Sequence, residues 1–283
     1  MLYSIFSGIT IYHNKLVCVV LKSGNTGWRI QRCFTYPVQN KQDWQFAGAE
    51  LHKHLPKWRN CVAISLGFEE VLSKSSVINA SLSLDEELSY VKELLSQVSG
   101  EAPLAYDYKR RVCTNTEDEI NLYICKKETL DTLLCLPNLA VDVVGWRLTD
   151  LYVLSQELLS KIETATHYFI DLTAEYGVVA CLDRRCDCMF FDVRAESFAE
   201  LVLGFCLGHI PPSSVNNDTK IGVLVFGLEP EVLKLTNGLA HLPNLRCIHA
   251  AQYVHCHASL SFSDTYPALA CALGAKYWRE GIE

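Results

Sequence analysis

The stretch Tyr168-Phe169-Ile170-Asp171-Leu172 opens a run of apolar segments separated by short polar turns. Gly177–Leu182 and Cys188–Val193 continue the run, and apolar segments of this length between turn residues predict consecutive β-strands. A helical pattern across Ser197–Leu207 and an apolar strand at Ile221–Phe226 follow. The predicted order is three strands, a helix and a strand, or βββαβ.

The same order is found near the N-terminus. Trp44, Ala47 and Leu51 recur at helical spacing and predict a helix that Asp43 can cap. The strands predicted around this helix are Tyr3–Ile11, Lys15–Leu21, Trp28–Tyr36 and Cys61–Leu66, with a turn at 23–27. The two copies begin roughly 165 residues apart, which indicates a duplicated domain with insertions and not a short repeat. We therefore expect two α/β lobes.

The segment between the two copies predicts an inserted subdomain. Ser83-Leu84-Asp85-Glu86 has the pattern of a capping box, and apolar residues continue at helical spacing up to Val98. The elements predicted after it are strands at Ala105–Val112, Ile120–Ile124 and Ala140–Trp146, and helices at Glu128–Leu134 and Thr149–Lys161. We expect a first lobe at residues 1–162, with the insertion at about 78–137, and a second lobe at 163–283. The polar connector 160–166 is the expected boundary, and 211–218 an expected surface loop.

Composition narrows the class of protein. The chain has 283 residues, of which 49% are hydrophobic and 20% charged, as in a packed globular protein. Its net charge of −7 is the wrong sign for wrapping nucleic acid, so no direct nucleic-acid partner is expected. The cysteines number 13, an odd count, and scatter through predicted strands and helices, which favours buried thiols in a reducing cytoplasm. The N-terminus lacks the pattern of a signal peptide, and no apolar run has the length of a membrane-spanning helix.

A βββαβ core used twice, with an insertion after the first copy, resembles the actin-like proteins, and within them the PilM family. The resemblance includes the opening strand Gly8-Ile9-Thr10, the acidic helix at 84–88 and the second opening strand with Asp171-Leu172-Thr173. It also includes the apolar last helix, preceded by an aromatic, at 266–275. The resemblance implies an α/β, actin-like fold, with an RNase H-like βββαβ core in each of two lobes and an α+β subdomain inserted in the first.

The family resemblance also implies a function. PilM-like proteins are cytoplasmic components of type IV pilus machines, or of related competence (DNA-uptake) machines, at the inner face of the inner membrane. They act as adaptors that bind the N-terminal tail of a PilN-like inner-membrane protein in a groove of the first lobe. Binding of an extended peptide by a groove and a sheet edge is physically sound, because backbone hydrogen bonds supply affinity. Further platform components are expected partners, and membrane association is expected through the partner; no motif identifies the groove residues.

The expected nucleotide site is degenerate. Of the family's nucleotide pattern the chain retains Asp171, Thr173 and Gly227 as candidate cofactor-binding residues. The first phosphate hairpin has Thr10 where the family has Asp, followed by the bulky Tyr12-His13-Asn14. The second continues as Ala174-Glu175-Tyr176, and the adenosine loop reads Phe226-Gly227-Leu228, with one glycine of three. These departures resemble the HofM branch and the cytoplasmic part of the type II secretion L protein.

Two interpretations of Asp171 follow. It is either a residual organiser of Mg²⁺ and phosphate or a strand-end aspartate that caps a turn, and the loss of the surrounding loops favours the turn cap. We therefore expect an adaptor without catalytic residues that does not hydrolyse ATP, with ATP and Mg²⁺ disfavoured as cofactors. The alternative is an ATP-binding actin-like ATPase whose nucleotide state gates partner binding.

Other constellations give weaker signals. Cys247-Ile248-His249 and His255-Cys256-His257 contain zinc-type ligands, but their spacing is not that of a structural zinc site, so no metal is expected. Cys186-Asp187-Cys188 is expected at a hairpin tip. The basic clusters Lys109-Arg110-Arg111 and Lys126-Lys127 are candidates for anionic lipid, against the alternative of a solvated sheet face. The sequence contains no Gly-x-Ser-x-Gly, His-Glu-x-x-His or Walker motif.

Overall fold

The computed structural model describes residues 4–24, 27–98, 102–136, 139–162, 166–173, 175–182, 187–209, 221–240, 245–254 and 261–280. The predicted loop at 211–218 and the centre of the predicted connector, 163–165, lie outside these residues. Within the described ranges, none of the helices combines the length and the hydropathy that crossing a bilayer requires.

The first sheet has five strands in the order β3-β2-β1-β4-β8. They are β1 (Ile5–Tyr12), β2 (Lys15–Gly24), β3 (Gly27–Pro37), β4 (Asn60–Leu66) and β8 (Val143–Trp146), and helix α1 (Lys41–His54) precedes β4. The pairs β1–β2 and β2–β3 are antiparallel, whereas β1–β4 and β4–β8 are parallel. A parallel pair needs a crossover connection, and α1 supplies it between β3 and β4.

The second sheet repeats this arrangement in the order β11-β10-β9-β12-β13. Its strands are β9 (Thr166–Leu172), β10 (Tyr176–Cys181), β11 (Cys188–Asp192), β12 (Ile221–Gly227) and β13 (Leu245–His249). Helix α5 (Phe198–Gly208) precedes β12, and α6 (Glu229–Leu239) precedes β13, which is followed by the short helix η3 (Ala250–Tyr253). The predicted duplication of a βββαβ unit is confirmed.

A third sheet, of the order β5-β7-β6, lies between β4 and β8 in the chain. The short helix η1 (Phe68–Glu70) leads into β5 (Val71–Asn79), α2 (Leu84–Ser96), β6 (Leu104–Val112), β7 (Glu117–Lys126) and α3 (Lys127–Leu134). Strand β5 has no counterpart among the predicted strands, because its polar run at 73–76 interrupts the apolar alternation. The division into residues 1–162 and 163–283, with an insertion at about 78–137, stays a prediction.

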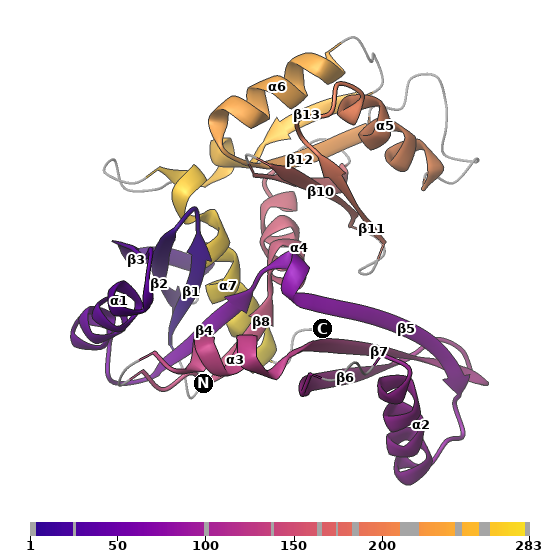
Figure 1. Cartoon of the computed structure of the whole chain (residues 1–283). Helices are drawn as coiled ribbons and strands as arrows, with labels where there is room; N and C mark the ends of the chain where they lie inside the picture. Colours follow the sequence, from indigo (N-terminus) through magenta and orange to yellow (C-terminus); the bar gives the residue numbers. More distant parts are fainter. Residues whose placement is uncertain are drawn as a thin grey trace.

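Two helices connect the five-stranded sheets. Helix α4 (Arg147–Leu159) follows β8, and α7 (Phe262–Glu280) is the last described element. Figure 1 shows both helices running between the two sheets, and one hydrophobic core includes residues of both helices and of both sheets. The ends of these helices that meet the second sheet therefore position the residues at the lobe junction.

Local sequence signals account for several helix ends. The capping box of α2 is confirmed: the amide of Ser83 donates to Glu86 Oε2 at 2.9 Å, and the amide of Glu86 donates to Ser83 Oγ at 3.4 Å. The predicted cap of α1 is wrong. Asn40 is the N-cap and accepts from two amides, while Asp43 lies in the first turn and accepts from the amide of Gln39 at 2.9 Å. The helix starts earlier than predicted because Asn40 satisfies its free amides first.

Candidate functional site

The candidate site lies at the junction of the two lobes, around Asp171. This residue is next to the end of β9, where it is buried and flanked by Phe226 of β12. Its Oδ2 lies 2.7 Å from Nη2 of Arg147, the first residue of α4. Its Oδ1 accepts a hydrogen bond from the hydroxyl of Tyr266, on α7. Asp171 therefore forms a buried ion pair with one lobe-connecting helix and a hydrogen bond with the other.

Aromatic rings surround the guanidinium of Arg147. Its carbon Cζ is 4.8 Å from the ring centre of Tyr12, 5.2 Å from that of Phe68 and 5.8 Å from that of Tyr266. Nη2 of Arg147 also donates to the hydroxyl of Tyr266 at 2.9 Å. The side chain is only 7% exposed. Cation–π contacts of a desolvated guanidinium add to the attraction of the carboxylate.

The hydroxyl protons follow from the geometry. The hydroxyls of Tyr12 and Tyr266 are 3.1 Å apart. Because Tyr266 gives its one proton to Asp171 and accepts from Arg147, Tyr12 must be the donor to Tyr266. The four side chains therefore form one continuous polar network from β1 of the first sheet to β9 of the second.

Burial keeps both phenols neutral. It raises the pKa of Tyr12 to about 12, helped by the negative charge of Asp171. The same two causes raise the pKa of Tyr266 well above its usual range. Burial alone would lower the pKa of Arg147, but Asp171, together with smaller contributions from Tyr266, Tyr12 and Tyr176, outweighs it and the net direction is upward. Arg147 is therefore the positive charge at this junction and Asp171 its counter-charge.

The other two predicted cofactor-binding residues, Thr173 and Gly227, shape the local backbone. The hydroxyl of Thr173 donates to the carbonyl of Tyr176 at 2.8 Å and accepts from its amide at 3.1 Å, which closes the hairpin between β9 and β10. Gly227 has a φ of +134°, and a Cβ there would lie 2.6 Å from the carbonyl oxygen of Leu172. The assignment of Asp171, Thr173 and Gly227 to a nucleotide site stays a prediction.

The first predicted phosphate hairpin is a tight two-residue turn. His13 and Asn14 adopt φ values of 48° and 57°, as turns between twisted antiparallel strands require. Thr10 is buried in β1, and Tyr12 ends the strand with its ring against Tyr266. In the second hairpin, the hydroxyl of Tyr176 donates to Glu69 Oε2 at 3.1 Å, across the junction; Ala174 lies outside the described residues.

Sequence reasoning missed Arg147 and Phe68 and gave Tyr266 no role beyond its aromatic character. Phe68 lies in η1, directly after β4, and Arg147 starts the helix directly after β8. The available signal was a basic residue at the first position of a helix whose buried face is largely leucine. No local pattern shows that its partner is Asp171, because the two residues are on different lobes.

The structure describes only part of the cysteine and histidine groups that the sequence analysis considered as metal or redox sites. His249 Nε2 lies 3.1 Å from Thr236 Oγ1, and Cys247 is half-buried in β13. His255, Cys256, His257 and Cys186 lie outside the described residues. Among the residues that the structure does describe, no group of three His, Cys, Asp or Glu side chains could hold a metal ion.

Arg110 is not available to lipid. Its guanidinium is 2.7 Å from Glu87 Oε2 and 2.6 Å from Asp118 Oδ2, and it donates to the carbonyls of Leu82 and Ala80 at 3.1 and 2.6 Å. It fastens the loop before α2 to the edge strand β6. The predicted lipid cluster 109–111 therefore loses its central cation, because two carboxylates already compensate it.

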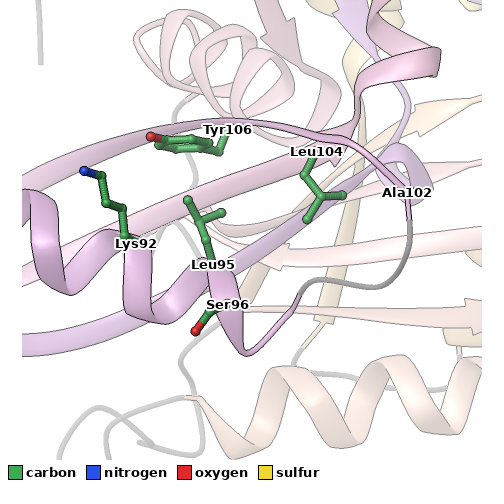
Figure 2. A pocket seen from close by; sticks show the side chains of 6 residues that line it. All are labelled: Lys92, Leu95, Ser96, Ala102, Leu104 and Tyr106. Carbon is green, nitrogen blue, oxygen red and sulfur yellow. The ribbon is translucent and has the colours of Figure 1, made fainter.

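A shallow groove opens between α2 and β6, with a volume of about 270 Å³. It is lined by Lys92, Leu95, Ser96, Ala102, Leu104 and Tyr106. Figure 2 shows Leu95 between the side chains of Lys92, Tyr106 and Leu104. Because β6 is an edge strand of its sheet, a backbone edge and an apolar groove lie side by side here.

Comparison with known proteins establishes the fold. No protein-family model and no curated protein gives a significant match to the chain. Among solved structures, a chain of the PilM–PilN type IV pilus biogenesis complex matches with a TM-score of 0.64 and 14% identity, over 95% of this chain and 98% of that one. A protein of actin-like ATPase fold and unknown function from Bacteroides thetaiotaomicron matches with a TM-score of 0.50 and 10% identity, over 87% and 91% of the two chains. The cytoplasmic domain of EpsL, an inner membrane component of the type II secretion system of Vibrio cholerae, has a TM-score of 0.46, 11% identity and coverages of 87% and 86%.

The first two similarities show that this chain has the actin-like fold, with the overall arrangement of a chain of the PilM–PilN complex. The fold class expected from the sequence is confirmed. At these identities the likeness carries the fold alone, and the HofM branch stays a prediction.

Proposed function

We propose that this chain is a cytoplasmic adaptor of a type IV pilus, or of a related competence or secretion machine, at the inner face of the inner membrane. In this proposal the actin-like body docks the N-terminal tail of a PilN-like inner-membrane protein, contacts further platform components and does not hydrolyse ATP. The observation that carries it is the ion pair between Arg147 and Asp171, which occupies the junction between the two lobes. The fold shared with a chain of the PilM–PilN complex supports the class of partner.

The ion pair opposes Mg²⁺ binding for an electrostatic reason. A metal that uses Asp171 must replace Arg147 as its counter-charge, and this would leave the guanidinium buried without a carboxylate. Removing one partner of a buried ion pair costs about 3–5 kcal/mol. The phenols of Tyr12 and Tyr266 fill the adjacent space and would also have to move. The chain's own cation thus takes the role that a metal ion has in an actin-like nucleotide site.

The alternative, an ATP-binding protein whose nucleotide state gates docking, has one observation in its favour. A guanidinium beside two strand ends is chemically suited to hold a phosphate group. The 7% exposure of Arg147 argues against it, because a phosphate would have to open the junction to reach the nitrogen atoms. We therefore place the alternative second.

We place the tail at the groove between α2 and β6. An extended peptide can continue the sheet at the edge of β6 through backbone hydrogen bonds, while Leu95, Leu104 and Tyr106 offer apolar contacts for one of its side chains. Lys92, at the rim, would favour an acidic or carbonyl group of the peptide. The register of the peptide would follow from the groove, since alternate side chains of a strand point to the same face.

The proposal is tested by calorimetric titration of the purified chain with Mg·ATP and, separately, with a synthetic N-terminal peptide of the PilN-like protein. We expect peptide binding and no heat from nucleotide. Nucleotide affinity in the micromolar range would overturn the adaptor proposal and return Asp171 to the role of metal organiser.

A variant pair tests the place of docking. Leu95→Ser, in the groove, should weaken peptide binding about tenfold or more, because burying an apolar side chain contributes about 1.5–3 kcal/mol. Leu84→Ser, on the same helix but 65% exposed and outside the groove, is the matched control and should bind as the parent does. Peptide binding that both variants retain would place the tail elsewhere on the chain.

A further inference from the structure

The edge of the first sheet where β1 and β4 begin carries two exposed tryptophans. Trp58 lies in the loop before β4 and is 84% exposed, and Trp278, in the last turn of α7, is 60% exposed. The loop is held in place because the amides of Ser4 and Ile5 both donate to the carbonyl of Arg59, at 3.1 and 3.0 Å. Single exposed apolar side chains are ordinary, but two indole rings at one edge of a sheet are not.

The end of α7 reaches this same edge. Nη2 of Arg279 lies 3.7 Å from Oδ1 of Asp142, whose Oδ2 accepts from the amide of Val62 in β4 at 2.9 Å. The guanidinium of Arg279 also stacks on the ring of Trp278, with 4.5 Å between Cζ and the ring centre. Arg279 and Asp142 therefore link the last turn of α7, which carries Trp278, to Val62 of β4, four residues after Trp58 in the chain.

Basic residues neighbour both tryptophans along the chain, although the whole chain has a net charge of −7. Lys57 and Arg59 flank Trp58 and are exposed, and Lys22 pairs with Ile5 in the register of β1 and β2. Lys22, Lys57 and Arg59 form no ion pair with any residue that the structure describes. The tryptophan edge, defined as Lys22, Lys57, Trp58, Arg59, Trp278 and Arg279, is therefore a basic and aromatic surface on an acidic protein.

We propose that the tryptophan edge binds an anionic lipid bilayer surface directly. Indole rings partition to the level of the lipid headgroups, where the apolar ring and the polar N–H are both satisfied. Lysine and arginine beside them are attracted by anionic headgroups. A protein partner would need pockets that match the two rings. A lipid headgroup layer needs no such pockets, because its molecules rearrange around protruding rings. Protrusion of Trp58 at a loop therefore favours the bilayer over an acidic protein.

The tryptophan edge and the lobe junction lie at opposite ends of β1. Strand β1 leads from Ile5 at the tryptophan edge to Tyr12 at the junction, and its eight residues span about 25 Å. Binding of this edge to a membrane would therefore keep the lobe junction about one strand length away from the bilayer surface. The inference goes beyond the proposed adaptor function, because it requires no partner protein.

Vesicles test the inference with the purified chain alone. The chain should cosediment with mixed phosphatidylglycerol and phosphatidylcholine vesicles at low salt, and hardly at all with phosphatidylcholine vesicles. Each basic residue near an anionic surface contributes about 1 kcal/mol, or about fivefold in partitioning, so Lys57→Glu with Arg59→Glu should weaken binding at least tenfold. Trp58→Ala should also weaken it, and the blue shift that vesicles cause in the tryptophan fluorescence should be smaller in this variant than in the parent.

Matched controls separate this surface from general charge and hydrophobicity. Lys126→Glu with Lys127→Glu changes the same charge at the other predicted basic cluster, and Phe46→Ala removes a 62% exposed ring from α1; both should bind as the parent does. Equal losses in the test and control variants would overturn the proposal, as would equal binding to neutral and anionic vesicles. Retention on immobilised polyglutamate without binding to anionic vesicles would assign the edge to an acidic protein and overturn it as well. Peptide and nucleotide titrations have no bearing on these outcomes.

Discussion

At the scale of single residues, Arg147 and its ion pair with Asp171 hold the two lobes together. Its guanidinium and the carboxylate of Asp171 stand 2.7 Å apart and almost out of contact with water. Neither charge would be tolerated there alone, because an unpaired buried ion costs several kcal/mol. A buried ion pair is a weak source of net stability but strongly disfavours arrangements that separate its members. Here such arrangements include every conformation in which the two lobes move apart at Asp171.

Replacing Arg147 alone should therefore lower the stability of the folded protein more than replacing Arg147 and Asp171 together. We expect Arg147→Met to lower the free energy of unfolding by about 3–5 kcal/mol, because Asp171 is left buried and uncompensated. The double variant Arg147→Met with Asp171→Asn should recover a large part of the loss. Urea unfolding followed by circular dichroism measures both values. Equal stability of the parent and Arg147→Met would show that the two charges are not coupled.

Asp150 is a second buried carboxyl, on α4. Its Oδ2 accepts from Ser65 Oγ at 2.6 Å, and Gly145 lies so close that a Cβ there would be 2.8 Å from both carboxyl oxygens. Burial raises its pKa from the ordinary 3.8 to about 7, although the bond from Ser65 opposes the shift. The folded protein therefore holds a proton at Asp150 that the unfolded chain releases near pH 4.

The pH dependence of stability follows from this difference in pKa. Because the folded state binds more protons between pH 4 and pH 7, the contribution of Asp150 is fully present below pH 4 and is lost as the pH rises towards 7. Relative to Asp150→Asn, the parent should lose a few kcal/mol of unfolding free energy over this range, at about 1.4 kcal/mol per pKa unit. Parallel stability profiles of the two proteins from pH 4 to pH 7 would contradict the assignment.

At the scale of elements, helix α7 packs with its backbone against the first sheet. Gly8 in β1 faces α7, and a Cβ at this position would overlap the carbonyl oxygen of Ala268 and the amide nitrogen of Ala272. The small residues on both elements let the helix backbone lie directly on the strand. This explains why the opening strand has a glycine where strands usually have a larger residue.

A pair of glycine variants separates this contact from ordinary helix propensity. Gly8→Ala should destabilise the protein by about 1–3 kcal/mol, because backbone atoms of α7 must move to make room. Gly204→Ala, on α5, places its methyl group in open space and should raise stability by up to about 1 kcal/mol. Thermal unfolding of both variants gives the two signs directly, and a neutral Gly8→Ala would show that α7 adjusts without cost.

At the scale of the whole molecule, the two sheets share one core through α4 and α7. The shared core contains Val17 and Cys61 of the first sheet, Phe169 and Val178 of the second, and Leu269 of α7. The insertion has a separate cluster around Ile120 and Leu122, which α2 covers. Residues that share one core lose their contacts together, so we expect the two lobes to unfold as a single cooperative unit.

Cysteine labelling tests this expectation. Cys61 in the first sheet, Cys181 in the second and Cys271 in α7 are buried, whereas Cys113 and Cys135 are exposed. The exposed pair should react with a thiol reagent in the native protein. The buried three should become reactive together, at one denaturant concentration, as mass spectrometry of labelled peptides can determine. Earlier labelling of Cys181 than of Cys61 would mean that the lobes unfold separately.

Much of the fold was readable from local pattern. Strand alternation and helical spacing identified both βββαβ units, and Ser83 with Glu86 marked the start of α2 correctly, because these signals depend on residues that are neighbours in the chain. Strand β5 was not predicted, because its residues do not alternate between apolar and polar; its pairing with β7 makes it a strand. Asp43 was mistaken for a cap because Asn40, three residues earlier, competes for the same amides.

The amino-acid sequence was enough to specify which segments form strands and helices, their order and the duplication, because backbone propensity and hydrophobic periodicity act over a few residues. The contents of the lobe junction were decided by tertiary structure alone. Arg147 meets Asp171 of the other lobe, and Tyr266 meets Tyr12 from 254 positions away, only because α4 and α7 bring their ends to the place where β1 and β9 finish. The same holds for Arg110. In the sequence it belongs to a basic cluster and looks like a free cation, whereas in the folded chain it forms ion pairs with Glu87 and Asp118. Charge partners separated along the chain leave no local pattern, since their energy depends on distance in space and on burial.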